Sequence, residues 1–139
     1  MTTPKRDWRA HSLDGVFLRF IVHENRKVNG LIMHDWLLKK AQKLGIHGGC
    51  AFHGIAGFGR HGILHEQSFW ELAGDLPVEI RFVCSEDEAY RLLDVVEEAK
   101  LSVFYVFSPT RYGIAGADRA DWSEGMPHAG PARPAGNAN

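Results

Sequence analysis

The chain has 139 residues, which is the size of one ordinary domain built on a single hydrophobic core. Its formal net charge of -1 excludes the strong basic excess of a general nucleic-acid-binding protein, and no apolar run approaches the roughly 20 residues of a membrane span. The 45% of hydrophobic and 24% of charged residues are typical of a soluble globular protein, and two cysteines without a disulfide framework suit a reducing cytoplasm.

Apolar residues at strand and helix spacing predict four strands and two helices. In chain order these are a strand at 16–23, a helix at 31–44, a strand from 50 to about 57, a strand at 78–84, a helix from 86 to about 100 and a strand at 103–107. Asn29 is the expected cap of the first helix and Gly45 its stop. Ser85 and Glu88 form the capping-box pattern that begins the second helix. Residues 60–70 fit either an extension of a β-hairpin or a short turn of helix.

The order strand, helix, strand, strand, helix, strand is that of the ferredoxin-like βαββαβ arrangement, an α+β fold. Right-handed crossovers would place both helices on one face of a four-stranded antiparallel sheet and leave the other face uncovered. That uncovered face is expected to mix apolar side chains with two arginines, namely Phe17, Ile21, Ile55, Val83, Arg19 and Arg81. Exposed apolar sheet of this extent favours association, so we expect a homo-oligomer whose subunits cover each other's sheets.

The stretch from residue 48 to residue 62 begins as a strand and continues as a glycine-rich loop. Glycine lets the backbone approach a ligand closely, and successive backbone N–H groups can hold a phosphate without an excess of positive charge. Arg60, Arg81 and Arg111 could add bidentate contacts to such an anion. The residues alone leave two alternatives open, a cradle for a small anionic ligand such as a nucleotide and a flexible hairpin with solvated arginines.

Three short segments are similar to segments of the PII-like signalling proteins. They are Gly54-Ile-Ala-Gly-Phe-Gly59, Asp75-Leu-Pro-Val-Glu-Ile80 and the Ser85-Glu-Asp-Glu-Ala start of the second helix. The sequence most resembles the small bacterial branch long known only as a domain of unknown function. The match spans about residues 14–113 and keeps the predicted elements in register.

The resemblance implies a homotrimer of ferredoxin-like subunits with their sheets turned inward. It implies that an adenine nucleotide (ATP, ADP, AMP or cyclic AMP) binds in the clefts between subunits. The connection between the second and third strands, at about 55–70, would be the mobile effector loop, or T-loop. This loop would dock on a membrane transporter or an enzyme. A cytoplasmic protein, recruited peripherally to such a transporter, is expected. Residues 55–70 contain no tyrosine, whereas typical PII loops carry one that is uridylylated, and no Gly-Asp-Gly-Lys phosphate loop follows the second helix.

The glycine loop and the resemblance together predict a set of nucleotide-binding residues. They lie at the base of the connection or carry a guanidinium group, and they are Gly54, Gly57, Phe58, Gly59, Arg60, Arg81 and Arg111. Backbone N–H groups of residues 57–59 would contact phosphate, and Arg60 or Arg111 would neutralise it. The expected division of the chain is an N-terminal arm at 1–13, the PII-like domain at 14–113 and a Gly/Ala/Pro-rich tail at 114–139.

A cluster of histidines supports an alternative function. His53, His61 and His65 lie close together in the sequence, and imidazole is a good ligand for zinc or copper. The alternative is therefore a metal-binding stress protein on the same trimer. His53 also fits a half-buried position at the end of a strand.

Catalysis and RNA binding find little support in the residues. Asp75 and Glu79 do not form an evident acid–base pair, and a thiol nucleophile at Cys50 or Cys84 would need a base and an electropositive site. The third strand lacks the stacking aromatics with which sheets of this fold bind RNA. We therefore expect a protein that is not an enzyme and does not bind nucleic acid.

Overall fold

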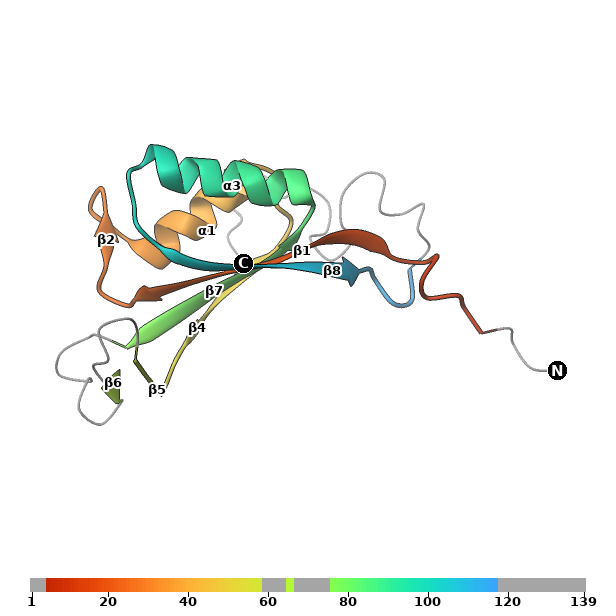
Figure 1. The fold of residues 1–139 in the computed structure, drawn as a ribbon, viewed down its shortest axis with the longest axis horizontal. Helices are drawn as coiled ribbons and strands as arrows, with labels where there is room; N and C mark the ends of the chain where they lie inside the picture. The colour runs from red at the N-terminus through yellow and green to blue at the C-terminus, as the bar shows by residue number, and fades with distance from the viewer. Residues whose placement is uncertain (1–4, 59–64, 67–75, 118–139) are drawn as a thin grey trace.

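A computed structural model describes residues 5–58, 65–66 and 76–117, with the backbone alone described at 65–66. Its elements, in chain order, are β1 (Leu13–His23), β2 (Lys27–Val28), β3 (Leu31–Ile32), α1 (Met33–Lys43), β4 (Gly49–His53), β5 (Ala56–Gly57), β6 (His65–Glu66), β7 (Pro77–Cys84), α3 (Glu86–Glu98) and β8 (Phe104–Tyr112). The long strands form one antiparallel sheet in the order β4-β7-β1-β8. Both helices lie on the same side of this sheet (Figure 1). The ferredoxin-like fold is thus confirmed.

The sheet has one face packed against the helices and one that we call the open face. Alternate residues of β1 and β7 point to each side, and the helix-facing residues of β1 (Val16, Leu18, Phe20, Val22) are at most 4% exposed. Phe20 of β1 and Phe82 of β7 meet edge to face with ring centroids 6.2 Å apart. The helices add Met33, Trp36, Leu37, Ala41, Ala89, Leu92 and Val96 to this core.

Helix α1 begins two residues later than predicted, and Asn29 is not its cap. Asn29 and Gly30 have φ angles of 51° and 82° and form the turn of a small hairpin between β2 and β3. The hairpin uses Leu31 and Ile32 as a strand, so the helix starts at Met33, whose N–H donates to the carbonyl of Arg26 at 2.7 Å. The predicted stop is correct, because Gly45 has φ 87° directly after the last turn.

Helix α3 has the predicted capping box. The Ser85 hydroxyl accepts a hydrogen bond from the Glu88 backbone N–H at 3.2 Å, and the Glu88 carboxylate accepts from the Ser85 N–H at 2.9 Å. Each side chain satisfies a backbone donor that the first turn would otherwise leave without a partner.

Strand β8 is longer than predicted, because it continues through Ser108, Pro109 and Thr110 to Tyr112. Pro109 pairs with Val16 in the register, and a proline can be accommodated there because β8 is an edge strand of the sheet. The extension also explains why β1 starts at Leu13, three residues before the predicted strand, since Leu13 pairs with Tyr112.

Candidate functional site

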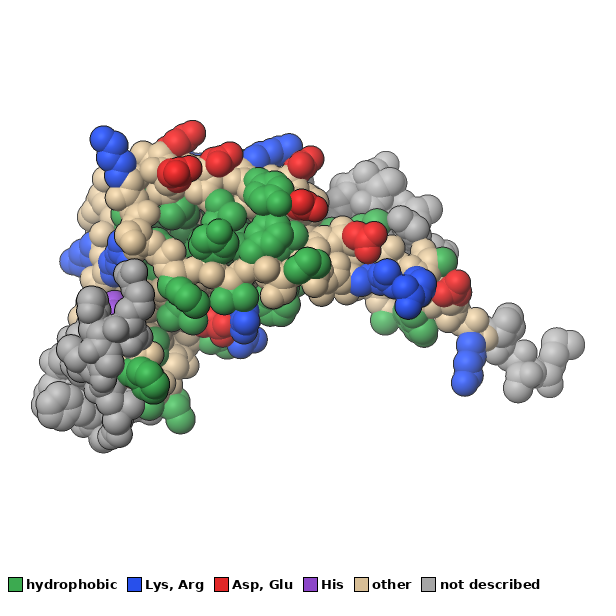
Figure 2. Space-filling view, viewed as in Figure 1, with side chains coloured by type: hydrophobic (Ala, Val, Ile, Leu, Met, Phe, Trp, Pro, Cys, Tyr) green, Lys and Arg blue, Asp and Glu red, His purple; other side chains and the backbone are tan. Residues whose placement is uncertain are grey.

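The open face carries large apolar side chains from all four long strands. The register places Phe17 and Ile21 of β1, Phe52 of β4, Val83 of β7 and Phe104 of β8 on it. Ile21, Val83, Phe52 and Phe104 are 41%, 39%, 45% and 59% exposed. Figure 2 shows hydrophobic side chains beneath the sheet, on the side away from the helices. The open face is therefore apolar as predicted, with one correction: Ile55 lies in a bend beyond β4 and is not part of the sheet.

A cluster of charged side chains, Arg19, Glu79 and Arg81, lies at the centre of the open face. Arg19 Nη1 donates to Glu79 Oε1 at 3.3 Å, while Arg81 Nε and Nη2 lie 3.0 and 2.8 Å from Glu79 Oε2. The Arg81 guanidinium stacks over Phe52 at 4.4 Å from the ring centroid, and that of Arg19 over Phe17 at 5.6 Å. Acidic and basic side chains meet beneath the sheet in Figure 2. Both arginines are thus held against aromatic rings.

Glu24 joins the two ends of the connection between β4 and β7. Its Oε2 lies 2.7 Å from His53 Nε2 at the end of β4, and its Oε1 accepts the Leu76 N–H at 3.4 Å. The Glu24 backbone N–H also donates to the Leu76 carbonyl at 2.9 Å. The Glu24 side chain, directly after β1, therefore holds both the point where the connection leaves the sheet and the point where it returns.

We expect the Glu24→Ala variant to expose the Leu76 amide to solvent exchange. Loss of one net hydrogen bond of about 1 kcal/mol corresponds to roughly fivefold faster exchange of that amide. Native-state hydrogen exchange followed by NMR measures this rate. The Gly54 amide serves as internal control, because it donates to the Pro77 carbonyl at 2.7 Å and not to Glu24. An unchanged Leu76 rate would show that Glu24 does not hold the connection.

The first residues of the connection combine a tightly packed glycine with two exposed apolar side chains. Gly54 packs tightly, since a Cβ there would lie 2.8 Å from Pro77 Cγ. Ala56 pairs with Glu66 and Gly57 with His65, which forms the two-stranded sheet β5–β6. Ile55 and Phe58, on either side of β5, are 75% and 73% exposed. The base of the connection therefore offers backbone and two exposed apolar side chains to a ligand or a partner.

The structure brings some predicted nucleotide-binding residues together and separates others. Gly54, Gly57 and Phe58 all lie at the base of the connection, beyond the end of β4. Arg81 lies on the open face and is engaged by Glu79. Arg111 pairs with Asp14 at the opposite end of the sheet, on the other edge strand, with 3.6 Å between Nε and Oδ1. Within one subunit Arg111 is therefore remote from the predicted loop base. The other two predicted residues, Gly59 and Arg60, lie outside the described residues.

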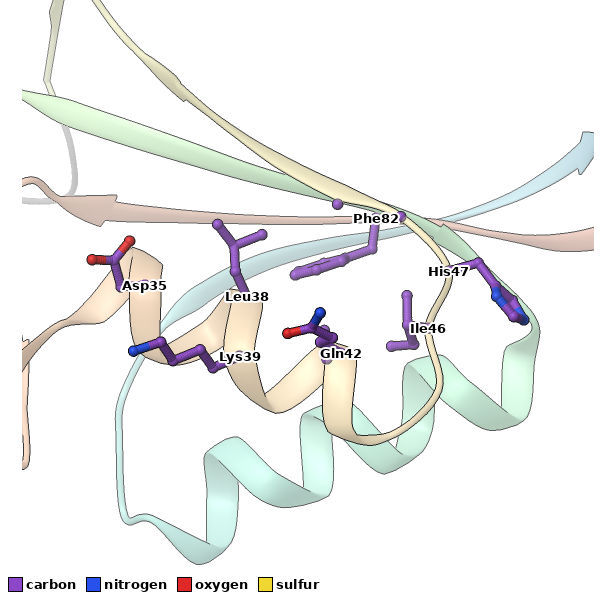
Figure 3. Close-up of a pocket in the computed structure, with 10 residues that line it drawn as sticks. Asp35, Leu38, Lys39, Gln42, Ile46, His47 and Phe82 are labelled. Carbon is purple, nitrogen blue, oxygen red and sulfur yellow. The ribbon is translucent and has the colours of Figure 1, made fainter. Parts of the chain in front are cut away.

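Two shallow hollows of similar size adjoin the first residues of β4. One of about 360 Å³ lies between α1 and the sheet and is lined by Asp35, Leu38, Lys39, Gln42, His47 and Phe82, among others. Figure 3 shows Leu38, Gln42, Ile46 and Phe82 around this space, with His47 on the connection that follows α1. The second, of about 380 Å³, lies on the open face and includes Phe17, Cys50, Phe52, Arg81, Val83 and Tyr112 in its lining. Gly48 and Gly49 border both hollows.

The histidines predicted as metal ligands are only partly described. His53 is the strand-end residue held by Glu24, whereas His61 and the side chain of His65 lie outside the described residues. Among the side chains that the structure does describe, no group of three or more His, Cys, Asp or Glu is close enough to hold a metal ion. The metal hypothesis stays a prediction.

The two cysteines differ in exposure. Cys50 is exposed on β4, whereas Cys84 is buried on the helix-facing side of β7. Burial, with a smaller contribution from the Glu88 carboxylate, raises the pKa of the Cys84 thiol to about 11. Cys84 is therefore a protonated core residue at neutral pH and does not supply a thiolate.

Sequence reasoning missed the roles of Glu24, Glu79 and Tyr112. Glu79 alternates with apolar residues in a strand, which only indicates a side chain on the less buried face. Tyr112 covers Gly15, where an added Cβ would lie 2.5 Å from Tyr112 Cε1. A glycine inside a strand pattern is a signal of close packing that could have pointed to this contact. No local pattern marks Glu24, because its partners lie far away in the sequence.

Solved structures share this arrangement of sheet and helices. The chain matches CPII, a nitrogen regulatory PII-like protein from Thiomonas intermedia K12 bound to ADP, AMP and bicarbonate, with a TM-score of 0.58 and 16% identity over 74% of this chain and 92% of CPII. It matches a PII-like signalling protein from Thermus thermophilus with a TM-score of 0.53 and 14% identity over 73% of this chain and 92% of that protein. The fold is thus that of the PII-like proteins.

A match to a protein-family model identifies the family to which the chain belongs. The model of DUF190, described as Uncharacterized ACR, COG1993, matches residues 15–111, and the chain belongs to this family. A UPF0166 protein from Aquifex aeolicus (strain VF5) is 26% identical over 80 residues, which are 58% of this chain and 76% of that protein. The resemblance inferred from the sequence is confirmed. Neither helix in the described part of the chain is long and apolar enough to cross a membrane.

Proposed function

We propose that this protein is a homotrimeric PII-like regulator that binds an adenine nucleotide in the clefts between its subunits. The connection at 55–70 acts on a partner, a membrane transporter or an enzyme, and nucleotide binding orders it. The trimer is built from residues 14–113, flanked by the arm at 1–13 and the tail at 114–139. The protein works in the cytoplasm without catalysing a reaction and is recruited to its partner.

The observation that carries this proposal is the apolar open face beside the base of the connection. Such a face, with four large side chains about 40–60% exposed, favours burial against further copies of the chain. The separation of Arg111 from Gly57 supports a composite site, since a neighbouring subunit can supply the guanidinium that the same subunit cannot. The nucleotides held by CPII, which has the same fold, support adenine as the base.

Calorimetric titration with ATP, ADP, AMP and cyclic AMP tests the nucleotide part of the proposal. We expect at least one of them to bind, and the Gly57→Val variant to bind it at least tenfold more weakly. A Cβ at residue 57 lies 3.3 Å from Pro77 Cγ, so the subunit accommodates it with a small shift. The added side chain would nevertheless keep a phosphate from the backbone N–H groups.

A matched control is Ala115→Val, which adds bulk at an exposed residue beyond the far end of β8. It should bind nucleotide as the wild type does. If none of the four nucleotides binds, or if Gly57→Val binds with unchanged affinity, the proposed site is wrong. Sedimentation analysis of the same samples tests the trimer separately.

A further inference from the structure

The open face carries more positive than negative charge. In the four long strands that the structure describes, its fully charged side chains are Arg19, Glu79 and Arg81. Two guanidinium groups share one carboxylate, so each subunit has one net positive charge at this place. Arg19 and Arg81 are direct cross-strand partners, and like charges opposite each other destabilise a sheet pair. Glu79 compensates for only one of them.

Assembly through the open face makes this imbalance costly. In one subunit, the side chains of Arg19, Arg81 and Glu79 keep 39%, 41% and 21% of their surface exposed, and water screens them. When three sheets turn toward each other, water leaves and three net charges come together. Desolvated charge without a partner opposes association strongly, so an anion held between the subunits would favour assembly.

We propose that the Arg19–Glu79–Arg81 clusters of neighbouring subunits together bind a small inorganic oxyanion such as phosphate. This site rests on the proposed homotrimer and lies away from the base of the connection; it assigns to the anion Arg81, which the sequence had placed among the nucleotide-binding residues. The bound oxyanion offsets part of the positive charge that the three carboxylates leave uncompensated, and it thereby stabilises the assembly.

The geometry of the arginines suits an oxyanion. A guanidinium group has five N–H donors in one plane, and it binds oxyanions in a bidentate manner. Arg19 directs Nη1 to Glu79, and Arg81 directs Nε and Nη2 to it, so further N–H groups of both remain for another acceptor. The guanidinium carbons of Arg19 and Arg81 lie over the rings of Phe17 and Phe52, and these contacts restrict both side chains, which reduces the entropy lost when an anion binds.

The test compares phosphate with chloride at equal ionic strength, using wild type, Arg19→Gln, Glu79→Gln and, as a control, Arg91→Gln on α3. The melting temperature and the sedimentation of each protein are measured in both buffers. Because one anion serves three subunits, phosphate at ten times its dissociation constant should raise the melting temperature of the wild type and of Arg91→Gln by about 2 °C. Arg19→Gln should lose this response and assemble more tightly than the wild type in chloride. Glu79→Gln should depend more strongly on phosphate.

Phosphate also stabilises proteins in general, and all four proteins share that effect. Comparison with the control variant therefore shows how much of each response is specific to the open face. If the wild type and the three variants all form trimers that respond equally to phosphate, the anion site is overturned and the proposed function stands. A wild type that stays a single subunit in both buffers at every concentration would overturn both. Measuring the phosphate response of Gly57→Val separates the two possible sites of phosphate binding. If Gly57→Val loses the response to inorganic phosphate, the response belongs to the nucleotide site and the anion site is wrong.

Discussion

Replacing Ile21 and Val83 together by glutamate is expected to convert the trimer into single, folded subunits. Both side chains lie on the open face, 41% and 39% exposed in the subunit, so neither contributes to its core. In the proposed trimer the exposed two fifths of each side chain become buried, which is worth roughly 0.6–1.2 kcal/mol per side chain, since burying a whole aliphatic side chain is worth about 1.5–3 kcal/mol. The double variant removes this gain from each subunit and places six carboxylates in a desolvated interface, which costs several further kcal/mol.

Sedimentation velocity and light scattering measure the mass of this variant, and circular dichroism measures its folding. The matched control is the Leu31→Glu, Ile32→Glu double variant, whose original side chains are 39% and 38% exposed on the hairpin before α1. The control carries the same added charge at equal exposure but away from the open face, so it should remain a trimer. A trimeric Ile21→Glu, Val83→Glu protein would show that the subunits meet through some other surface.

The elements that the sequence predicted well are those with local causes. Strand β7 is recognisable because its apolar residues alternate over the entire strand, and helix α3 begins at a capping box contained within four residues. In both cases the residues that determine the structure are neighbours in the sequence. The period-two pattern also assigned the faces of β1 correctly, and with them the apolar open face.

The parts that sequence reasoning missed depend on pairing between distant segments. Strand β8 continues past Pro109 because β1 lies beside it and supplies hydrogen-bond partners as far as Leu13. Likewise Glu24 contacts His53 and Leu76, which are 29 and 52 residues away in the sequence. Arg19 and Arg81 become neighbours only through the register of β1 with β7. The candidate site is therefore a product of the topology, whereas its residue types alone suggested an anion.

Phe82→Ala is expected to destabilise the subunit more than any other variant discussed. Phe82 is 1% exposed, meets Phe20 edge to face and forms part of both hollows beside β4. Removing a buried phenyl ring costs about 3–5 kcal/mol, which combines the lost transfer free energy with the cavity left behind. Urea denaturation followed by tryptophan fluorescence measures this loss at constant protein concentration. Leu31→Ala, at a position 39% exposed on the hairpin before α1 and away from the open face, should cost less than about 1 kcal/mol.

Adding a methyl group at Gly49 tests how tightly the Phe82 ring is packed. A Cβ on Gly49 would lie 2.5 Å from Phe82 Cε1 and 2.6 Å from Cδ1, so Gly49→Ala must displace a buried aromatic ring. We expect a cost of about 1–3 kcal/mol, as for other overpacked cores. In the Phe82→Leu background the ring is gone, and Gly49→Ala should cost at least about 1 kcal/mol less. If the two substitutions are additive within about 0.5 kcal/mol, the glycine is required at the start of β4 for a reason other than its contact with Phe82.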